Sequence, residues 1–412
     1  MATLIFNIKQ LVGVREESKL LKGKELSALP SIENAYLVIE NGSIAEYGNM
    51  DEIQNSKFKI QNKIDASGHF ILPCWCDSHT HLVFAASREE EFVDKINGMS
   101  YEEIAAKGGG ILNSAKKLNA MSEDELFDVS VKRLNEVIKL GTGAIEIKSG
   151  YGLSVEGELK MLRVIKRLKK VSPIPIKATF LGAHTYPLEY REDHKGYIDI
   201  IINEMLPVIA KEKLADYIDV FCENGFFSAE ETETICRAGI RQGLKAKIHA
   251  NQLNFSGGVE VGIKLNAVSV DHLETVNGDI INKLANSQTI GTLLPTAAFF
   301  LRMPFQPARQ IIDAGCAIAL ASDYNPGSSP SGNMNLVVAM SCTGMKMLPE
   351  EAINAATLNG AFAMELQDET GSITVGKKAN LIFTKAIPSL AYIPYAFGSN
   401  LIDKVMINGE IV

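Results

Sequence analysis

Short apolar runs alternate with amphipathic helical patterns through the middle of this chain, and few folds satisfy such a repeat. Several helices are expected to begin at capping boxes, as at Ser122 with Glu125 and at Ser228 with Glu231. Eight of the runs have the length and composition of strands, namely residues 69–73, 144–148, 176–180, 217–221, 245–249, 267–271, 289–293 and 317–321. Eight strands alternating with helices over about 300 residues predict an α/β protein with a (β/α)₈ TIM barrel, whose active site lies at the carboxyl ends of the strands. An open doubly wound sheet is the alternative, but no GxGxxG or P-loop motif follows any run.

The two ends of the chain carry β patterns instead. Strand-like runs flank Asn41-Gly42 near one end and Asn408-Gly409 near the other. Asn-Gly is favoured in two-residue hairpin turns because both positions tolerate positive φ. We therefore expect residues 1–68 and 365–412 to form one small β-sandwich domain, with the barrel formed by residues 69–364 between them.

Composition excludes several classes of protein. No run approaches the about 20 apolar residues of a membrane-spanning helix, and no signal-peptide pattern opens the chain, so we expect a cytoplasmic protein without a membrane partner. Six cysteines without a CxxC pair suit a reducing compartment. A net charge of -8 argues against a nucleic-acid partner and means that an anionic substrate needs a local cation. A homodimer is expected, although no residue pattern marks its interface.

Polar residues gather where the predicted strands end. Two histidines one residue apart on an extended backbone point the same way, so His79 and His81 can reach one ion. A lone histidine on a strand is more often a satisfied core residue than a ligand, but several at strand ends favour a metal site. The residues at or just after the strand ends are His79, His81, Tyr151, His184, Glu223, His249, His272 and Asp323. Cys74 and Cys76, beside this cluster, are interpreted as packing residues.

Several motifs resemble those of the imidazolonepropionases, within the amidohydrolase superfamily. The HxH motif marks only the superfamily, whereas the SGYGL segment at 149–153 and the DxNPGS segment at 323–328 are specific to the family. Similar segments, at 77–84, 87–89 and 271–273, spread the resemblance over essentially the whole chain. The resemblance implies a metal-dependent hydrolase on a (β/α)₈ barrel with a split β-sandwich. It also implies hydrolysis of the cyclic amide of 4-imidazolone-5-propanoate to N-formimidoyl-L-glutamate in histidine degradation.

The candidate metal ligands are three imidazoles and one carboxylate, from His79, His81, His249 and Asp323. A nitrogen-rich set without sulfur suits one zinc or iron ion per chain and leaves room for water. Asp323 is the expected proton carrier, and His272 is expected to stabilise the oxyanion. The alternative for Asp323 is a helix N-cap. Asp271 is expected to orient His272 from behind, and Glu146 and Lys148 are assigned to structural support.

The substrate-binding residues are implied by the resemblance, position by position. Arg88 is expected to hold the propionate carboxylate through its planar guanidinium, unless it is a surface residue of the acidic run that follows it. Tyr151 and His184 are expected to bind the ring or the carboxylate. Hydrogen bonds to the substrate are expected from Gln252, Asn325, Gly327 and Ser328.

One departure from the family concerns residues 251 and 252, where relatives often have an acid. Gln252 can donate hydrogen bonds to the ring but cannot act as a base. The missing acid keeps open the alternative of a non-catalytic metal-binding or ligand-binding relative. Another cyclic-amide hydrolase or deaminase of the superfamily is a further alternative, which Arg88 and the SGYGL segment disfavour. The run Gly108-Gly109-Gly110 is expected to be a mobile loop over the site.

Overall fold

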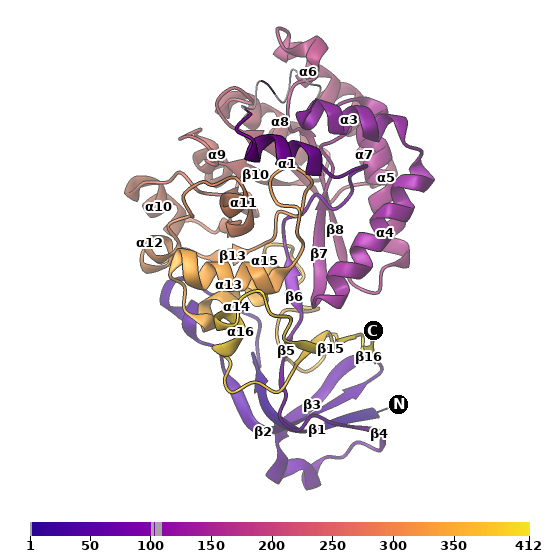
Figure 1. Cartoon of the computed structure of the whole chain (residues 1–412), viewed down its shortest axis with the longest axis vertical. Helices are drawn as coiled ribbons and strands as arrows, with labels where there is room; N and C mark the ends of the chain where they lie inside the picture. Colours follow the sequence, from indigo (N-terminus) through magenta and orange to yellow (C-terminus); the bar gives the residue numbers. More distant parts are fainter. Residues whose placement is uncertain (1, 100–102, 104–108) are drawn as a thin grey trace.

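The structure is a computed structural model that describes residues 2–99, 103 and 109–412. The named strands of these ranges form two sheets of eight strands each. In Figure 1, one sheet lies among the helices in the upper part of the molecule, and the other lies below it and contains both chain ends. The predicted (β/α)₈ barrel with a second β domain from both termini is therefore confirmed.

The barrel strands follow one another in sequence order, and each pairs with the next in parallel. They are β6 (Trp75–Asp77), β7 (Thr142–Lys148), β8 (Ile176–Ala183), β9 (Tyr217–Cys222), β10 (Lys245–Ala250), β11 (Ser269–His272), β12 (Ile290–Leu293) and β13 (Ile318–Leu320). Backbone hydrogen bonds just past β6 and β13 join the first strand to the last. The N–H of Asp323 donates to His79 O at 3.0 Å, and the N–H of His81 donates to Tyr324 O at 2.9 Å.

The second sheet combines strands from both ends of the chain. They are β1 (Ala2–Val12), β2 (Ser31–Glu40), β3 (Ser43–Asn49), β4 (Ile60–Asp65), β5 (Phe70–Pro73), β14 (Leu381–Thr384), β15 (Ile402–Ile407) and β16 (Glu410–Ile411). Both predicted Asn-Gly hairpin turns are confirmed. The φ angles are 51° and 79° at Asn41 and Gly42, and 50° and 81° at Asn408 and Gly409. Positive φ at both central positions is the type I′ geometry that matches the twist of the flanking strands.

The prediction that residues 69–73 form the first strand of the barrel is wrong. β5 pairs with β1 and with β14 in the terminal sheet, and the barrel begins with β6, which pairs with β7. An apolar run shows that a strand is buried but not which sheet buries it. We propose that the first domain boundary lies at Cys74, between β5 and β6. The boundary at residue 365 stays a prediction.

Helices cover the barrel strands, as Figure 1 shows. Their bounds are α1 (Glu89–Ile96), α3 (Gly110–Ala120), α4 (Glu123–Lys139), α5 (Val155–Val171), α6 (His194–Ile200), α7 (Leu206–Glu212), α8 (Ala229–Arg241), α9 (Gly258–Lys264), α10 (Gly278–Ala285), α11 (Pro295–Phe300), α12 (Ala308–Asp313), α13 (Met334–Met345), α14 (Pro349–Ala356), α15 (Leu358–Phe362) and α16 (Tyr392–Tyr395). Both predicted capping boxes are confirmed, at the starts of α4 and α8. Gly108 lies outside the described residues, while Gly110 begins α3 rather than continuing a loop. None of the helices in the described ranges has the length and apolarity needed to span a bilayer.

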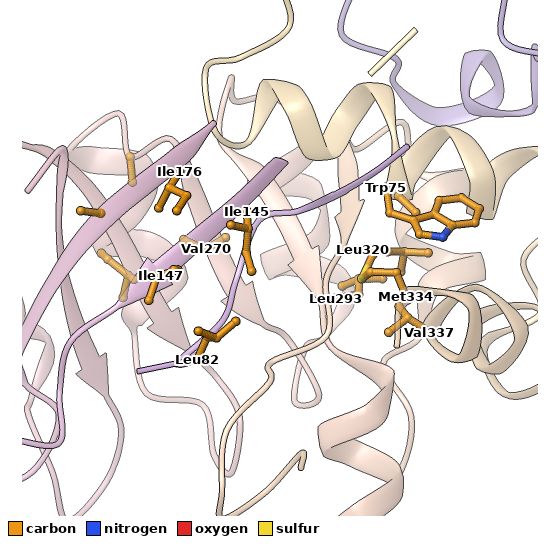
Figure 2. Packing of buried hydrophobic residues seen from close by; sticks show 14 of the residues in the cluster. Trp75, Leu82, Ile145, Ile147, Ile176, Val270, Leu293, Leu320, Met334 and Val337 are labelled. Carbon is orange, nitrogen blue, oxygen red and sulfur yellow. The ribbon is translucent and has the colours of Figure 1, made fainter. Parts of the chain in front are cut away.

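The main core lies between the barrel strands and the helices. Figure 2 shows Ile145, Ile147 and Val270 of the strands in one cluster with Met334 and Val337 of α13. Because side chains alternate along a strand, the neighbours of such residues point into the barrel instead. Glu146 and Lys148 occupy these inward positions on β7, so the interior of the barrel holds charge rather than a purely apolar filling.

Candidate active site

Three histidines and one aspartate meet at the carboxyl ends of the barrel strands. His79 and His81 follow β6, His249 lies on β10, and Asp323 follows β13. The Nε2 atoms of His81 and His249 are 3.4 Å apart. Asp323 Oδ1 lies 3.5 Å from His79 Nε2 and 3.6 Å from His81 Nε2. All four side chains are buried, and Asp323 has a φ of 51°, which non-glycine residues seldom adopt outside functional or turn positions.

These four side chains fit a single metal ion. Nitrogen atoms of the three histidines that could bind a metal all lie within 4.8 Å of one another. The buried Nε2 of His79 has no hydrogen-bond partner among the residues that the structure describes. Ligands at about 2.1 Å from a tetrahedral zinc ion are about 3.4 Å apart, close to the separations found here. The structure therefore brings all four predicted metal ligands together, with their potential ligand atoms close to one another.

Two buried carboxylates lie behind His79 and His249. His79 Nδ1 donates to Asp271 Oδ2 at 2.6 Å, and His249 Nδ1 lies 2.9 Å from Asp219 Oδ2. Such contacts fix the ring tautomer that leaves Nε2 available to a metal. The expectation that Asp271 orients His272 is wrong, because consecutive strand residues face opposite ways and Asp271 points to His79.

The carboxylates belong to an interior ionic network, which we define as Glu146, Lys148, Asp219, Lys247 and Asp271. Lys148 Nζ lies 2.7 Å from Glu146 Oε1 and 2.8 Å from Asp219 Oδ2. Burial acts to lower the pKa of Lys148, but its carboxylate neighbours outweigh burial and raise it above the ordinary value. Burial likewise acts to raise the pKa of Asp219, yet His249 and Lys148 hold it well below its usual range. Lys148 and Asp219 are therefore charged, although neither is exposed.

His272 has its own carboxylate partner, Glu274. His272 Nδ1 lies 3.3 Å from Glu274 Oε1, which also accepts a hydrogen bond from Gln306 Nε2 at 2.9 Å. Burial alone would lower the pKa of His272, but Glu274 outweighs burial and the pKa is raised. Burial raises the pKa of Asp323 to about 6, which His272 opposes. The two predicted catalytic groups thus interact electrostatically and have perturbed pKa values, as acid and base groups often do.

A cavity of about 230 Å³ opens at these groups. All the predicted catalytic and substrate-binding residues line it, together with His81 and His249, while His79 is buried beneath. Phe221, Phe226, Leu253 and Leu301 add apolar walls. A mostly apolar pocket with a few convergent polar groups is typical of a small-molecule site.

Arg88 enters the cavity from the start of α1, and α3 holds its side chain. Its Nε donates to Ser114 Oγ at 2.8 Å, and its guanidinium lies 5.9 Å from the ring centre of Tyr151. His184 donates from Nδ1 to Gly150 O at 2.9 Å, and burial lowers its pKa to about 3. Arg88 therefore supplies a cation to the cavity, and His184 is neutral.

The DxNPGS segment forms a tight turn in which Asn325 uses all its side-chain hydrogen-bonding groups. Its Nδ2 donates to Asp323 O and Ser328 Oγ at 2.7 and 2.8 Å, and its Oδ1 accepts from Gly327 N and Ser328 N, both at 2.8 Å. The side chain of Asn325 therefore shapes the turn, and its carboxamide has no group left for a substrate. Ser328 Oγ lies 3.3 Å from Asp323 Oδ2.

The loop that carries Gln252 is held by Glu223 at the end of β9. Glu223 Oε2 accepts from the N–H groups of Leu253 and Asn254 at 2.8 and 3.3 Å. The sequence thus identified Glu223 by its position, while its role as a loop support appears only in the structure.

Sequence reasoning missed two functional residues, Asp219 and Glu274. A sequence signal for both residues was available, because each is an acidic residue within or beside a strand that is otherwise apolar.

Comparisons with known proteins agree with this arrangement. A family model described as the Amidohydrolase family matches residues 70–412. An imidazolonepropionase of Flavobacterium johnsoniae is 60% identical over 100% of both chains, and one of Clostridium tetani is 44% identical over 95% of this chain and 93% of its own.

Solved structures support the fold alone. A triazine hydrolase variant, 14% identical, has a TM-score of 0.74 over 100% of this chain and 94% of its own. A 5-methylcytosine deaminase of Klebsiella pneumoniae, 15% identical, has a TM-score of 0.74 over 99% of this chain and 97% of its own. From the family model and the full-length relatives, this chain belongs to the amidohydrolase family and, within it, to the imidazolonepropionases.

Proposed function

We propose that this chain hydrolyses the cyclic amide of 4-imidazolone-5-propanoate to N-formimidoyl-L-glutamate. The observation that carries the proposal is one cavity lined both by His81, His249 and Asp323 of the three-histidine, one-aspartate cluster and by Arg88. The substrate has a reactive ring carbonyl at one end and a carboxylate at the other. The cavity therefore offers a group for each: the cluster for the carbonyl and the Arg88 guanidinium for the carboxylate.

The resident ion is zinc or iron, one per chain, held by His79, His81, His249 and Asp323. When bound, such an ion polarises a carbonyl and makes water more acidic. Asp271 accepts a hydrogen bond from Nδ1 of His79, and Asp219 Oδ2 lies 2.9 Å from Nδ1 of His249, so Nε2 of each ring would be available to the ion.

The substrate is oriented before the reaction by groups that follow five of the barrel strands. Arg88 binds the propionate carboxylate with two parallel hydrogen bonds, which its planar fork allows and a lysine does not. Neutral His184 and Tyr151 contact the ring or the carboxylate, and Gln252 donates a hydrogen bond to the ring. Gly327 and Ser328 line the same wall, and Asn325 contributes by holding their turn.

Asp323 transfers the proton, and His272 stabilises the negative charge that develops. Water oxygen bonds to the ring carbonyl carbon while Asp323 takes a water proton, and His272 stabilises the negative oxygen that develops. Asp323 then delivers the proton to the ring nitrogen as the carbon–nitrogen bond breaks. The atoms of one water molecule are thus divided between the new carboxyl group and the released nitrogen.

An ultraviolet assay tests the proposal. Metal-loaded protein should remove the absorbance of imidazolonepropionate and release N-formimidoyl-glutamate, whereas chelated protein and Asp323→Asn should not. Turnover of other cyclic amides or amines with no turnover of imidazolonepropionate would favour the broader hydrolase or deaminase alternative. Binding of the substrate without turnover would favour a non-catalytic relative. A cytoplasmic location and a homodimer stay predictions from the sequence.

A further inference from the structure

Lys148 is a buried cation that the proposed reaction does not use. It is the last residue of β7, and its side chain has no exposed surface. Its ammonium lies 2.8 Å from Asp219 Oδ2 and 3.5 Å from Asp271 Oδ2. These are the two carboxylates that contact His249 and His79. One ammonium therefore touches both groups that lie behind the metal-ligand histidines.

In both carboxylates the oxygen that faces Lys148 is also the oxygen that faces the imidazole. Oδ2 of Asp219 contacts Lys148 and lies 2.9 Å from His249 Nδ1, while its Oδ1 accepts the backbone N–H of His249 at 3.0 Å. Oδ2 of Asp271 contacts Lys148 and accepts from His79 Nδ1 at 2.6 Å. A shift of the ammonium would therefore move the atoms that set both ring orientations.

We propose that Lys148 is a positioning residue of the metal centre, because its ammonium holds Asp219 and Asp271 together and so fixes the rings of His249 and His79 for the ion. Without that charge, two buried carboxylates would repel each other and lose their common partner. The proposal depends on the proposed function only in taking these histidines as metal ligands.

Lys247 provides a matched control. It lies on the inside of β10, is as fully buried as Lys148, and pairs with Glu146, the third carboxylate of the network. Its remaining hydrogen bonds go to the carbonyl groups of Ser78 and Ala363, at 3.0 and 3.3 Å. Lys247→Met therefore removes an equal buried charge while the contacts of Asp219 and Asp271 with Lys148 stay in place.

Cobalt binding measures the effect without substrate. The Co²⁺ affinity of metal-free protein would be measured by competition with a chelator, and the visible absorption of the Co²⁺ complex would report the ligand geometry. Lys148→Met should bind Co²⁺ about 10- to 100-fold more weakly, the usual cost of losing an outer partner of a metal ligand, and should shift the visible bands. Lys247→Met removes a charge that also acts on Asp271 but removes no direct contact of Asp219 or Asp271, so it should weaken Co²⁺ binding less than Lys148→Met does.

Removing a positive charge near a cation would by itself strengthen binding, so weaker binding by Lys148→Met identifies lost positioning. Equal or tighter binding by Lys148→Met, or equal weakening by Lys247→Met, would overturn the proposal. If Lys148→Met does not fold, the double variant Lys148→Met/Asp219→Asn, which restores the charge balance, replaces it.

That double variant should bind Co²⁺ more weakly than Asp219→Asn alone, because Asp271 has also lost its contact with Lys148. Equal affinity of the two, or failure of the double variant to fold, would count against a role in the metal centre. These measurements use no substrate. Absence of turnover by the wild-type protein would therefore contradict the proposed function without affecting the conclusion about Lys148.

Discussion

Gly327 lies against the guanidinium of Arg88, and Gly327→Ala should therefore weaken substrate binding without weakening the fold. A β-carbon at residue 327 would lie 2.6 Å from Arg88 Nη1, about 0.8 Å inside the shortest ordinary contact of 3.4 Å. The φ of Gly327 is not among the positive values, so alanine suits the backbone. The atom that has to move is the far end of a flexible side chain, so we expect little change in the free energy of unfolding.

The magnitude follows from the displacement. A hydrogen bond of about 2.8 Å that lengthens by about 0.8 Å is no longer a hydrogen bond. Losing one of the two bonds between Arg88 and the carboxylate costs about 1.5 to 3 kcal/mol. We therefore expect kcat/KM for imidazolonepropionate to fall about ten- to a hundredfold, at about 1.4 kcal/mol per tenfold.

Steady-state kinetics and thermal unfolding of four proteins test this reasoning: wild type, Gly327→Ala, Arg88→Ala and the double variant. The double variant should be no worse than Arg88→Ala, because the glycine acts through the arginine. Fully additive losses, or an unchanged kcat/KM in Gly327→Ala, would refute the assignment of Arg88 to the substrate carboxylate.

Further predictions concern the other groups of the cavity. Arg88→Ala should cost about 2 to 4 kcal/mol in kcat/KM with unchanged metal content, and wild-type kinetics would remove Arg88 from the site. Gln252→Ala should reduce kcat/KM about ten- to a hundredfold, whereas Asp323→Asn, which alters a ligand and the base together, should cost on the order of 10⁴ or more. Equal losses of kcat/KM in these two variants, with metal bound in both, would contradict the division of roles between Gln252 and Asp323. Glu274→Gln should lower kcat with little change in KM, because His272 loses the charge that raises its pKa, and an unchanged kcat would show that His272 acts without Glu274.

The parts of the fold that the sequence predicts are those governed by local rules. Asn41-Gly42 and Asn408-Gly409 form their turns because both central residues have positive φ. The two capping boxes begin their helices because the serine and glutamate satisfy backbone groups within one turn. The strand-end histidines were found for a similar reason, since a parallel barrel brings every carboxyl end to one face.

The sequence did not reveal partners that are distant along the chain. Asp271 is next to His272 in sequence but faces His79, 192 residues away. β5 has the apolar pattern of a barrel strand, yet the sheet that buries it is decided by pairing with β1 and β14. Asn325 was expected to bind substrate, but only the folded turn shows that its carboxamide is already fully hydrogen-bonded.

Titration of metal-free protein with zinc or ferrous iron, followed by the hydrolysis of imidazolonepropionate at each step, tests the central claim most directly. Because three histidines and one aspartate form one ligand set, we predict that activity rises linearly with added metal and stops rising at one ion per chain. Full activity in the metal-free protein, or a rise that continues to two tightly held ions per chain, would contradict a mononuclear, metal-dependent hydrolase.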